Sequence, residues 1–196
     1  MKLYYSPGAC SLADHIALHE AGLSFDHEKV DLKAKTTESG ADFTEINPKG
    51  YVPALEIADG VVLTENIAIL DWIADQKAAL APAGDMGRYW LLEMLGFIST
   101  EIHKSFKPFF AGGSDDDKAR AKAAIEQRLD QIADMMEGDY LFGDQVSVAD
   151  AYLFVMLLWA GRMGVDMPEA LAAFQQRMMA RDAVKTAMAH EGLDRA

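Results

Sequence analysis

The chain has 196 residues, of which 51% are hydrophobic, so it can bury the core of one large domain or two small ones. Its 31 acidic and 18 basic residues give a formal net charge of −13, which disfavours nucleic acid and anionic membranes as partners. The sequence has no apolar run of the roughly 18 residues that a membrane span needs, and no signal-peptide core. Cys10 is the only cysteine, which excludes an internal disulfide, and we therefore expect a cytoplasmic protein.

The first half of the chain alternates between strand and helix patterns. Residues 2–5 and 25–32 are strand-like and flank a helical stretch that ends near Gly22. Residues 52–57 and 61–63 predict a hairpin that turns at Asp59-Gly60, and a helix pattern follows over 64–76. This order predicts an α/β domain made of a βαβ unit, a connecting region and a ββα unit.

From Pro82 onward the sequence has long amphipathic helix patterns and no strand pattern. Ser147 followed by Asp150, and Ser114 followed by three acidic residues, are start signals for two of these helices. Residues 79–86 are rich in Ala, Pro and Gly and interrupt the periodicity. We therefore predict an α/β domain over 1–78, a linker over 79–86 and an all-helical domain over 87–196.

Cys10 lies between a Pro7-Gly8 turn and the helix predicted to begin near Ser11. At a helix N-terminus, unpaired N–H groups and the helix dipole stabilise a thiolate and lower the pKa of the thiol. The alternative is a small, inert core residue. The position favours a reactive thiol.

Pro53 stands immediately before the first strand of the predicted hairpin. A cis peptide bond between Val52 and Pro53 would leave the peptide groups of Val52 free to pair with an extended peptide ligand, like an added strand. An ordinary edge-strand proline is the alternative.

Glu65 and Asn66 fall in the first turn of the predicted helix over 64–76. A carboxylate, an amide and unpaired N–H groups in one place can hold both the ammonium and the carboxylate of an amino acid. Simple capping of the helix is the alternative.

A third group of polar residues follows helical spacing in the second half. On an α-helix, Gly96, Thr100, His103 and Lys107 form one small and polar stripe. His103 with Lys104 or Lys107 would supply donors and positive charge for an anionic ligand, although a solvated face is the alternative.

Two histidines, His15 and His19, have the spacing of a metal-binding pair on a helix. The sequence identifies no third ligand beside them, so we predict no metal site. Phosphate-binding loops and the sequence signatures of serine hydrolases are absent as well.

The motifs named above, in this order, resemble the glutathione transferases, and the match is closest to the bacterial beta class. The resemblance rests on residues 1–23, 29–32, 46–55, 63–70, 101–106 and 146–160. It implies a thioredoxin-like N-terminal domain with a mixed sheet, an all-helical C-terminal domain, a homodimer, and a role in detoxification. It also implies that glutathione binds as co-substrate, mostly to the first domain.

The resemblance assigns site residues by position. Cys10 matches the beta-class cysteine that lies at the glutathione sulfur and can form a mixed disulfide with it. Ser11 and Tyr5 are alternative thiol partners, because other classes use Ser or Tyr for this purpose. The residues that the resemblance places around glutathione are Lys35, Val52, Pro53, Glu65, Asn66, Thr100, His103 and Lys104.

Two positions depart from the beta-class pattern. Asn66 stands where Ser or Gly is usual, and its bulk is expected to shift the γ-glutamyl group. Gly96 stands where Asn is frequent, and it removes a polar contact.

The leading hypothesis is a glutathione transferase in which glutathione thiolate attacks an electrophilic, apolar substrate, while His103 and Lys104 stabilise charge. One alternative is a glutathione-dependent thiol-disulfide oxidoreductase, because a single cysteine suits monothiol exchange. The other is a non-enzymatic binding protein that retains the fold. Four aromatic residues are expected either in the substrate pocket or in the core: Phe106, Phe109, Phe110 and Trp159.

Overall fold

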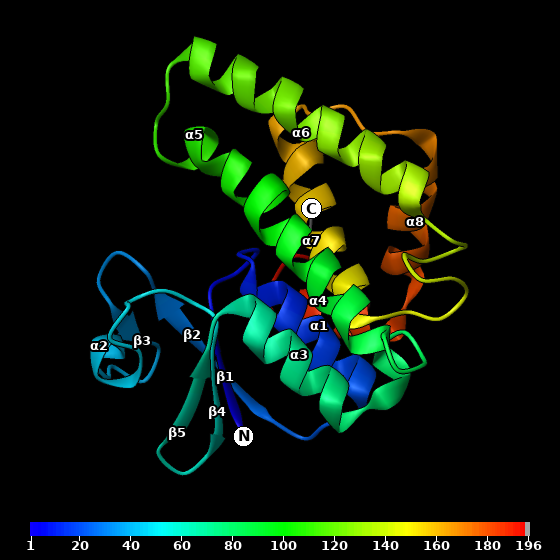
Figure 1. The fold of residues 1–196 in the computed structure, drawn as a ribbon. Helices are drawn as coiled ribbons and strands as arrows, with labels where there is room; N and C mark the ends of the chain where they lie inside the picture. The colour runs from blue at the N-terminus through cyan, green and yellow to red at the C-terminus, as the bar shows by residue number, and fades with distance from the viewer. Residues whose placement is uncertain (195–196) are drawn as a thin grey trace.

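The computed structural model describes residues 1–194. Its N-terminal part is a five-stranded mixed sheet with strand order β3-β2-β1-β4-β5 and helices packed against it (Figure 1). β1 runs parallel to β2, whereas β4 pairs antiparallel with both β1 and β5. The elements are β1 (Lys2–Tyr5), α1 (Ser11–Ala21), β2 (Asp26–Asp31), β3 (Thr36–Thr37), α2 (Phe43–Ile46), β4 (Ala54–Ala58), β5 (Val61–Thr64) and α3 (Asn66–Gln76). The predicted βαβ and ββα units are confirmed.

The connecting region between the two units contains regular structure that the sequence analysis did not predict. The two-residue strand β3 pairs antiparallel with β2, and the four-residue helix α2 follows it. Asp42 caps α2, and its side chain accepts a hydrogen bond from the Thr44 N–H at 2.8 Å. Such short elements give too few residues for a periodic pattern, so they were missed.

The C-terminal part is helical (Figure 1). Within residues 77–194 the only extended pairing is a single bridge between Tyr140 and Gly143. The elements are η1 (Ala78–Leu80), α4 (Gly87–Phe97), η2 (Ile98–Ile102), η3 (His103–Phe106), α5 (Lys107–Phe110), α6 (Asp115–Met135), α7 (Val148–Met163), α8 (Glu169–Ala180) and α9 (Asp182–His190). The predicted fold class, an α/β half followed by a helical half, is confirmed.

One hydrophobic core runs through both halves, because α1 packs against α7 and α9 as well as against α3. The predicted linker over 79–86 lies between α3 and α4, and Leu80 inside it is buried. The division into two domains with these boundaries stays a prediction. No helix in the described part of the chain combines the length and the apolar character needed to cross a bilayer.

Both predicted helix starts are confirmed as capping boxes. Asp150 is fully buried, and its carboxylate accepts hydrogen bonds from the Ser147 N–H at 2.7 Å and from the Leu141 N–H at 2.9 Å. The same residue pattern at Ser114 and Asp117 is exposed to solvent. The buried box therefore ties the start of α7 to the loop before it.

The stretch that carries Gly96, Thr100, His103 and Lys107 is not the continuous α-helix that the sequence predicts. After α4 the chain makes a π-helical segment, η2, and then a 3₁₀ segment, η3. A π turn takes more residues than an α turn, so it rotates every side chain after it relative to those before it. The predicted stripe of Gly96, Thr100, His103 and Lys107 is therefore broken between Thr100 and His103.

Candidate functional site

Cys10 lies in the loop between β1 and α1, which both halves of the protein hold in place. The Gly8 carbonyl accepts a hydrogen bond from Trp159 Nε1 at 2.8 Å, and the Gly8 N–H donates to Glu191 Oε2 at 2.8 Å. Gly8 has φ +68°, and a Cβ atom there would lie 3.1 Å from the Arg162 guanidinium. Glycine is therefore required at this turn, as the sequence indicated.

The Cys10 thiol is partly buried, and Sγ donates to the Val52 carbonyl oxygen at 3.7 Å. Burial and, after it, the nearby carboxyl of Asp14 raise the pKa of the thiol to about 12. Asp14 is itself fully buried, and its carboxyl oxygens have no hydrogen-bond partner within residues 1–194. The prediction of a lowered thiol pKa is wrong for the free protein, because desolvation outweighs the helix N-terminus.

Val52 faces Cys10 from the end of the loop before β4. The Val52–Pro53 peptide bond is cis, as predicted. The hydrogen bonds formed among the described residues do not use the Val52 N–H. Lys35 contacts the loop that leads to Val52, because its Nζ donates to the Gly50 carbonyl at 2.6 Å.

Glu65 forms a polar cluster with two residues that the sequence analysis missed. Its carboxylate accepts hydrogen bonds from Lys49 Nζ and, at 2.6 Å, from the Tyr51 hydroxyl. These two bonds, with the charge of Lys104 in addition, hold the pKa of Glu65 below its usual value. Glu65 has φ +77°, a strained value for a residue with a side chain, and such strain is concentrated at functional sites.

Lys49 and Tyr51 lie on either side of Gly50, just before the cis-proline. Their position next to this loop is the sequence signal that could have identified them. A cation and a phenol beside a loop that approaches a ligand are typical binding groups.

Asn66 points at the Cys10 loop. Its Nδ2 donates to the Cys10 carbonyl at 3.2 Å, and its buried Oδ1 has no partner among residues 1–194. The predicted role, donation to a ligand carboxylate, would require this bond to break. Asn66 is placed to fix the start of α1, and its bulk is accommodated there.

Thr100 lies in η2, and His103 and Lys104 are the first two residues of η3. The Thr100 hydroxyl donates to the Gly96 carbonyl at 3.0 Å, which satisfies it within the helix. His103 Nδ1 lies 2.6 Å from the Tyr152 hydroxyl, and burial, followed by the charge of Lys104, lowers the pKa of His103 to about 4. His103 is therefore neutral at neutral pH, and the predicted positive charge at this corner comes from the exposed Lys104.

The hydroxyls of Ser11 and Tyr5, predicted as alternative thiol partners, are directed elsewhere. Ser11 is fully buried, and its Oγ accepts from the Ser6 N–H at 3.2 Å, which closes the turn after β1. The Tyr5 hydroxyl donates to the His190 carbonyl at 3.4 Å. Neither hydroxyl is placed to hold a thiol beside Cys10.

The aromatic residues expected at the substrate pocket divide into two groups. Phe106 is fully buried in the core, whereas the Phe110 side chain is 56% exposed. Phe110 and His103 contact Trp159 edge-on, with ring centroids 4.8 and 5.0 Å apart. Because Trp159 also donates a hydrogen bond to the Gly8 carbonyl, these aromatic side chains border the loop that carries Cys10.

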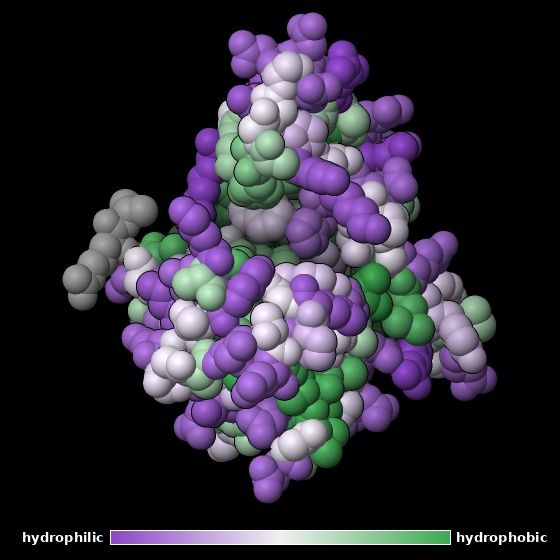
Figure 2. All heavy atoms as spheres, turned by 90° about the vertical axis from the view of Figure 1, so that its left-hand side faces the viewer, coloured by the Kyte–Doolittle hydropathy of each residue, from purple (hydrophilic) through white to green (hydrophobic). Residues whose placement is uncertain are grey.

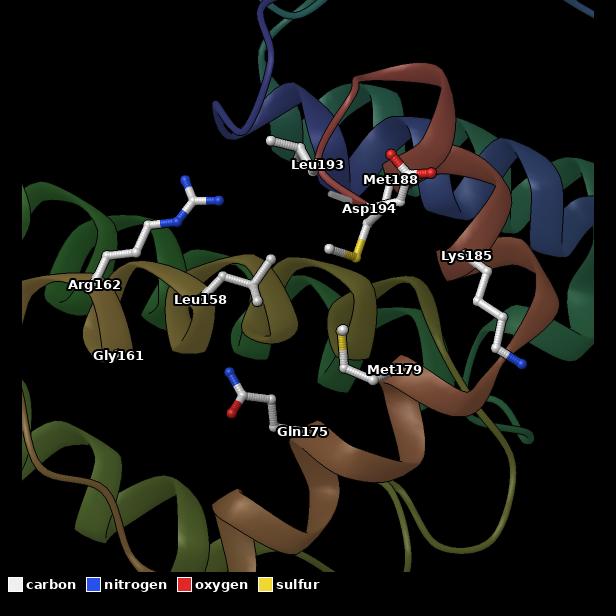
Figure 3. A pocket seen from close by; sticks show the side chains of 9 residues that line it. All are labelled: Leu158, Gly161, Arg162, Gln175, Met179, Lys185, Met188, Leu193 and Asp194. Carbon is white, nitrogen blue, oxygen red and sulfur yellow. The ribbon is translucent and has the colours of Figure 1, made fainter. Parts of the chain in front are cut away.

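Figure 2 shows the face of the molecule that carries α2 and α5, where hydrophilic residues surround smaller hydrophobic patches. A separate cavity of about 560 Å³ lies between α7, α8 and the C-terminal segment (Figure 3). Its lining includes Leu158, Arg162, Met179 and Leu193 but none of the predicted site residues. The predicted site residues therefore lie outside this cavity.

The sheet with its cis-proline and the cysteine before α1 define a thioredoxin-like protein with an added helical half. Two family models match the chain. The model of the glutathione S-transferase N-terminal domain matches residues 9–76, and the model of the glutathione S-transferase C-terminal domain matches residues 94–182. The chain is 42% identical to glutathione S-transferase GstA of Escherichia coli O157:H7, over 98% of this chain and 100% of that one. The chain therefore belongs to the glutathione S-transferase family.

Solved structures agree with this assignment. The ternary complex of BphK, a bacterial glutathione S-transferase, is 50% identical with a TM-score of 0.93, covering 98% of this chain and 100% of that one. A sphingomonad glutathione S-transferase in complex with glutathione is 48% identical with a TM-score of 0.92, at the same coverage. A third similar structure, also at 48%, is the beta-class enzyme of Sphingomonas chungbukensis.

Proposed function

We propose that this protein transfers glutathione, as its thiolate, to an electrophilic substrate. The observation that supports this most directly is at Val52, beside the cis-proline. No hydrogen bond among residues 1–194 uses its N–H, and its carbonyl oxygen contacts the Cys10 thiol. An extended peptide that pairs with Val52 places its own cysteine sulfur next to Cys10 Sγ. Glutathione is a peptide of this kind, and the relatives above are named as glutathione transferases.

The two ends of glutathione then meet complementary groups. Glu65 offers a carboxylate to the γ-glutamyl ammonium, at the N-terminus of α3 where free N–H groups suit the adjacent carboxylate. Lys35 and Lys104 are cations for the carboxylate groups, and the charge of Lys104 acts on Glu65. The family resemblance adds Thr100 and His103 to the residues around glutathione.

The thiol chemistry follows from the protonation state of Cys10. The glutathione thiol loses its proton to water, and the neutral Cys10 S–H donates a hydrogen bond to the resulting thiolate. Lys104 adds positive potential. The thiolate attacks the electrophilic atom, a carbon–sulfur bond forms, and the leaving group departs with the electron pair of the broken bond. The wall of Phe110 and Trp159 favours an apolar co-substrate, which fits a detoxification role.

A second candidate activity is monothiol exchange. Cys10 is the only cysteine of the sequence and lies where the glutathione sulfur is expected. In exchange, Cys10 thiolate attacks a glutathione disulfide, its S–S bond breaks, and one glutathione thiolate leaves. Activity on mixed disulfides, set beside activity on an aryl halide, separates the two reactions.

Calorimetric titration with reduced glutathione tests the shared binding step. We expect one saturable site per chain, and Glu65→Gln should weaken binding about tenfold, because a charge-assisted hydrogen bond contributes roughly 1.5 kcal/mol or more. Glu169→Gln, which changes an exposed acid in the first turn of α8, is the matched control and should bind like the wild type. Absence of binding at millimolar glutathione would rule out both enzymatic activities and leave the non-enzymatic alternative.

The homodimer implied by the family resemblance is part of the proposal. Large apolar side chains are exposed at Val61 (56%), Met86 (49%), Tyr89 (62%) and Trp90 (49%), and such surfaces are typical of protein interfaces. Light scattering should give twice the chain mass of 21.5 kDa. A single-chain mass at micromolar concentration would contradict the dimer.

A further inference from the structure

Four of the five histidines of this chain form one cluster outside the proposed glutathione site. His15 and His19 lie on α1, His27 on β2, and His190 at the end of α9. They meet because α1 packs against both α9 and β1. His27 lies on β2, where it is the pairing partner of Leu3 on β1. The spacing of His15 and His19 is evident from the sequence, whereas their proximity to His27 and His190 is not.

Three of these rings, those of His15, His27 and His190, are close enough to share one ion. One ring nitrogen of each lies within 4.8 Å of those of the other two. His15 Nε2 and His190 Nδ1 are 3.3 Å apart. Two nitrogens bound to a tetrahedral Zn²⁺ at about 2.0–2.1 Å lie about 3.3–3.4 Å from each other, so this pair already has the spacing of two zinc ligands.

The cluster also has the support that a metal-binding histidine needs. His15 is fully buried, and its Nδ1 lies 3.0 Å from Glu191 Oε1. A carboxylate that accepts from one ring nitrogen fixes the tautomer and turns the lone pair of the other nitrogen outward, here toward His190. His27 and His190 are exposed, so their side chains have the freedom to close on an ion that enters from solvent.

We propose that His15, His27 and His190 bind one divalent transition-metal ion of the zinc class. Three imidazoles suit Zn²⁺ and its neighbours in the first transition row, and they do not suit Ca²⁺ or Mg²⁺, which require oxygen ligands. Water takes the fourth position. Glu191 also accepts from the Gly8 N–H, so the support of the metal site is anchored to the loop that carries Cys10.

The first experiment is a titration of chelator-treated full-length protein with Zn²⁺ in competition with a chromophoric chelator, and a parallel titration with Co²⁺. We expect one ion per chain and the intense visible absorption of tetrahedral Co²⁺. His27→Gln and His190→Gln remove exposed ligands with little risk to the fold, and each should weaken binding at least tenfold. Glu191→Gln should weaken it by about ten- to a hundredfold through the orientation of His15.

The matched control is His103→Gln, which removes the fifth histidine, outside the cluster, and should leave Zn²⁺ affinity and stoichiometry unchanged. No saturable binding at micromolar Zn²⁺ would overturn the proposal. Equal binding by the wild type, His27→Gln and His190→Gln would overturn it as well, because the ion would then be held elsewhere. Neither result bears on glutathione binding, which the calorimetric titration measures separately.

Discussion

Asp150→Ala is expected to destabilise the protein by about 3–5 kcal/mol, the range for removing one partner of a buried charged network. The Asp150 carboxylate is fully buried and accepts from two backbone N–H groups and from the Ser147 hydroxyl. Alanine would leave the Ser147 and Leu141 N–H groups without partners in the core, at the start of the most buried helix. Urea unfolding measured at equilibrium gives the loss directly.

The protein contains its own control for this measurement. Asp117 occupies the same capping-box position at the start of α6 but is exposed. Asp117→Ala should therefore cost about 1 kcal/mol, the usual value of an exposed cap. Equal losses for the two variants would show that burial adds nothing to the box at Asp150.

Cys10→Ala should abolish the mixed disulfide that the wild type forms with glutathione disulfide, because no other cysteine exists in the sequence. Conjugation of glutathione to an aryl halide should fall only about tenfold, since one neutral hydrogen-bond donor is lost. Mass spectrometry of the intact chain detects the adduct, and initial rates give the second effect. Wild-type protein alkylated at Cys10 beforehand is the control for the adduct.

The pH dependence of adduct formation tests the thiol pKa itself. Burial raises the pKa of Cys10 to about 12, so the thiolate fraction and the rate should rise about tenfold per pH unit from about pH 6 to 9. A rate that levels off near neutral pH would show instead that the helix N-terminus stabilises the thiolate in the free protein.

The local structure around Cys10 follows from the sequence, but the charges in the site do not. The position of Cys10 before α1, the Gly8 turn and the Val52–Pro53 bond were all predicted and are confirmed. The same reasoning assigned a lowered pKa to Cys10, which is wrong, and a positive charge to His103 together with Lys104 or Lys107, of which His103 contributes none at neutral pH. The charge of each group depends on how deeply other segments bury it. His103, for example, is covered by Tyr152 and Trp159 of α7, which lie about 50 positions further along the chain.

The sequence by itself determined the order of the longer strands and helices and the starts of α6 and α7, because each depends on neighbours a few positions away. Only the tertiary structure decided the π turn before His103, the cluster of Lys49 and Tyr51 around Glu65, and the gathering of histidines from α1, β2 and α9. These features join residues that are up to 175 positions apart. Which distant side chains meet is set by packing of the common core, and periodicity along the chain carries no information about it.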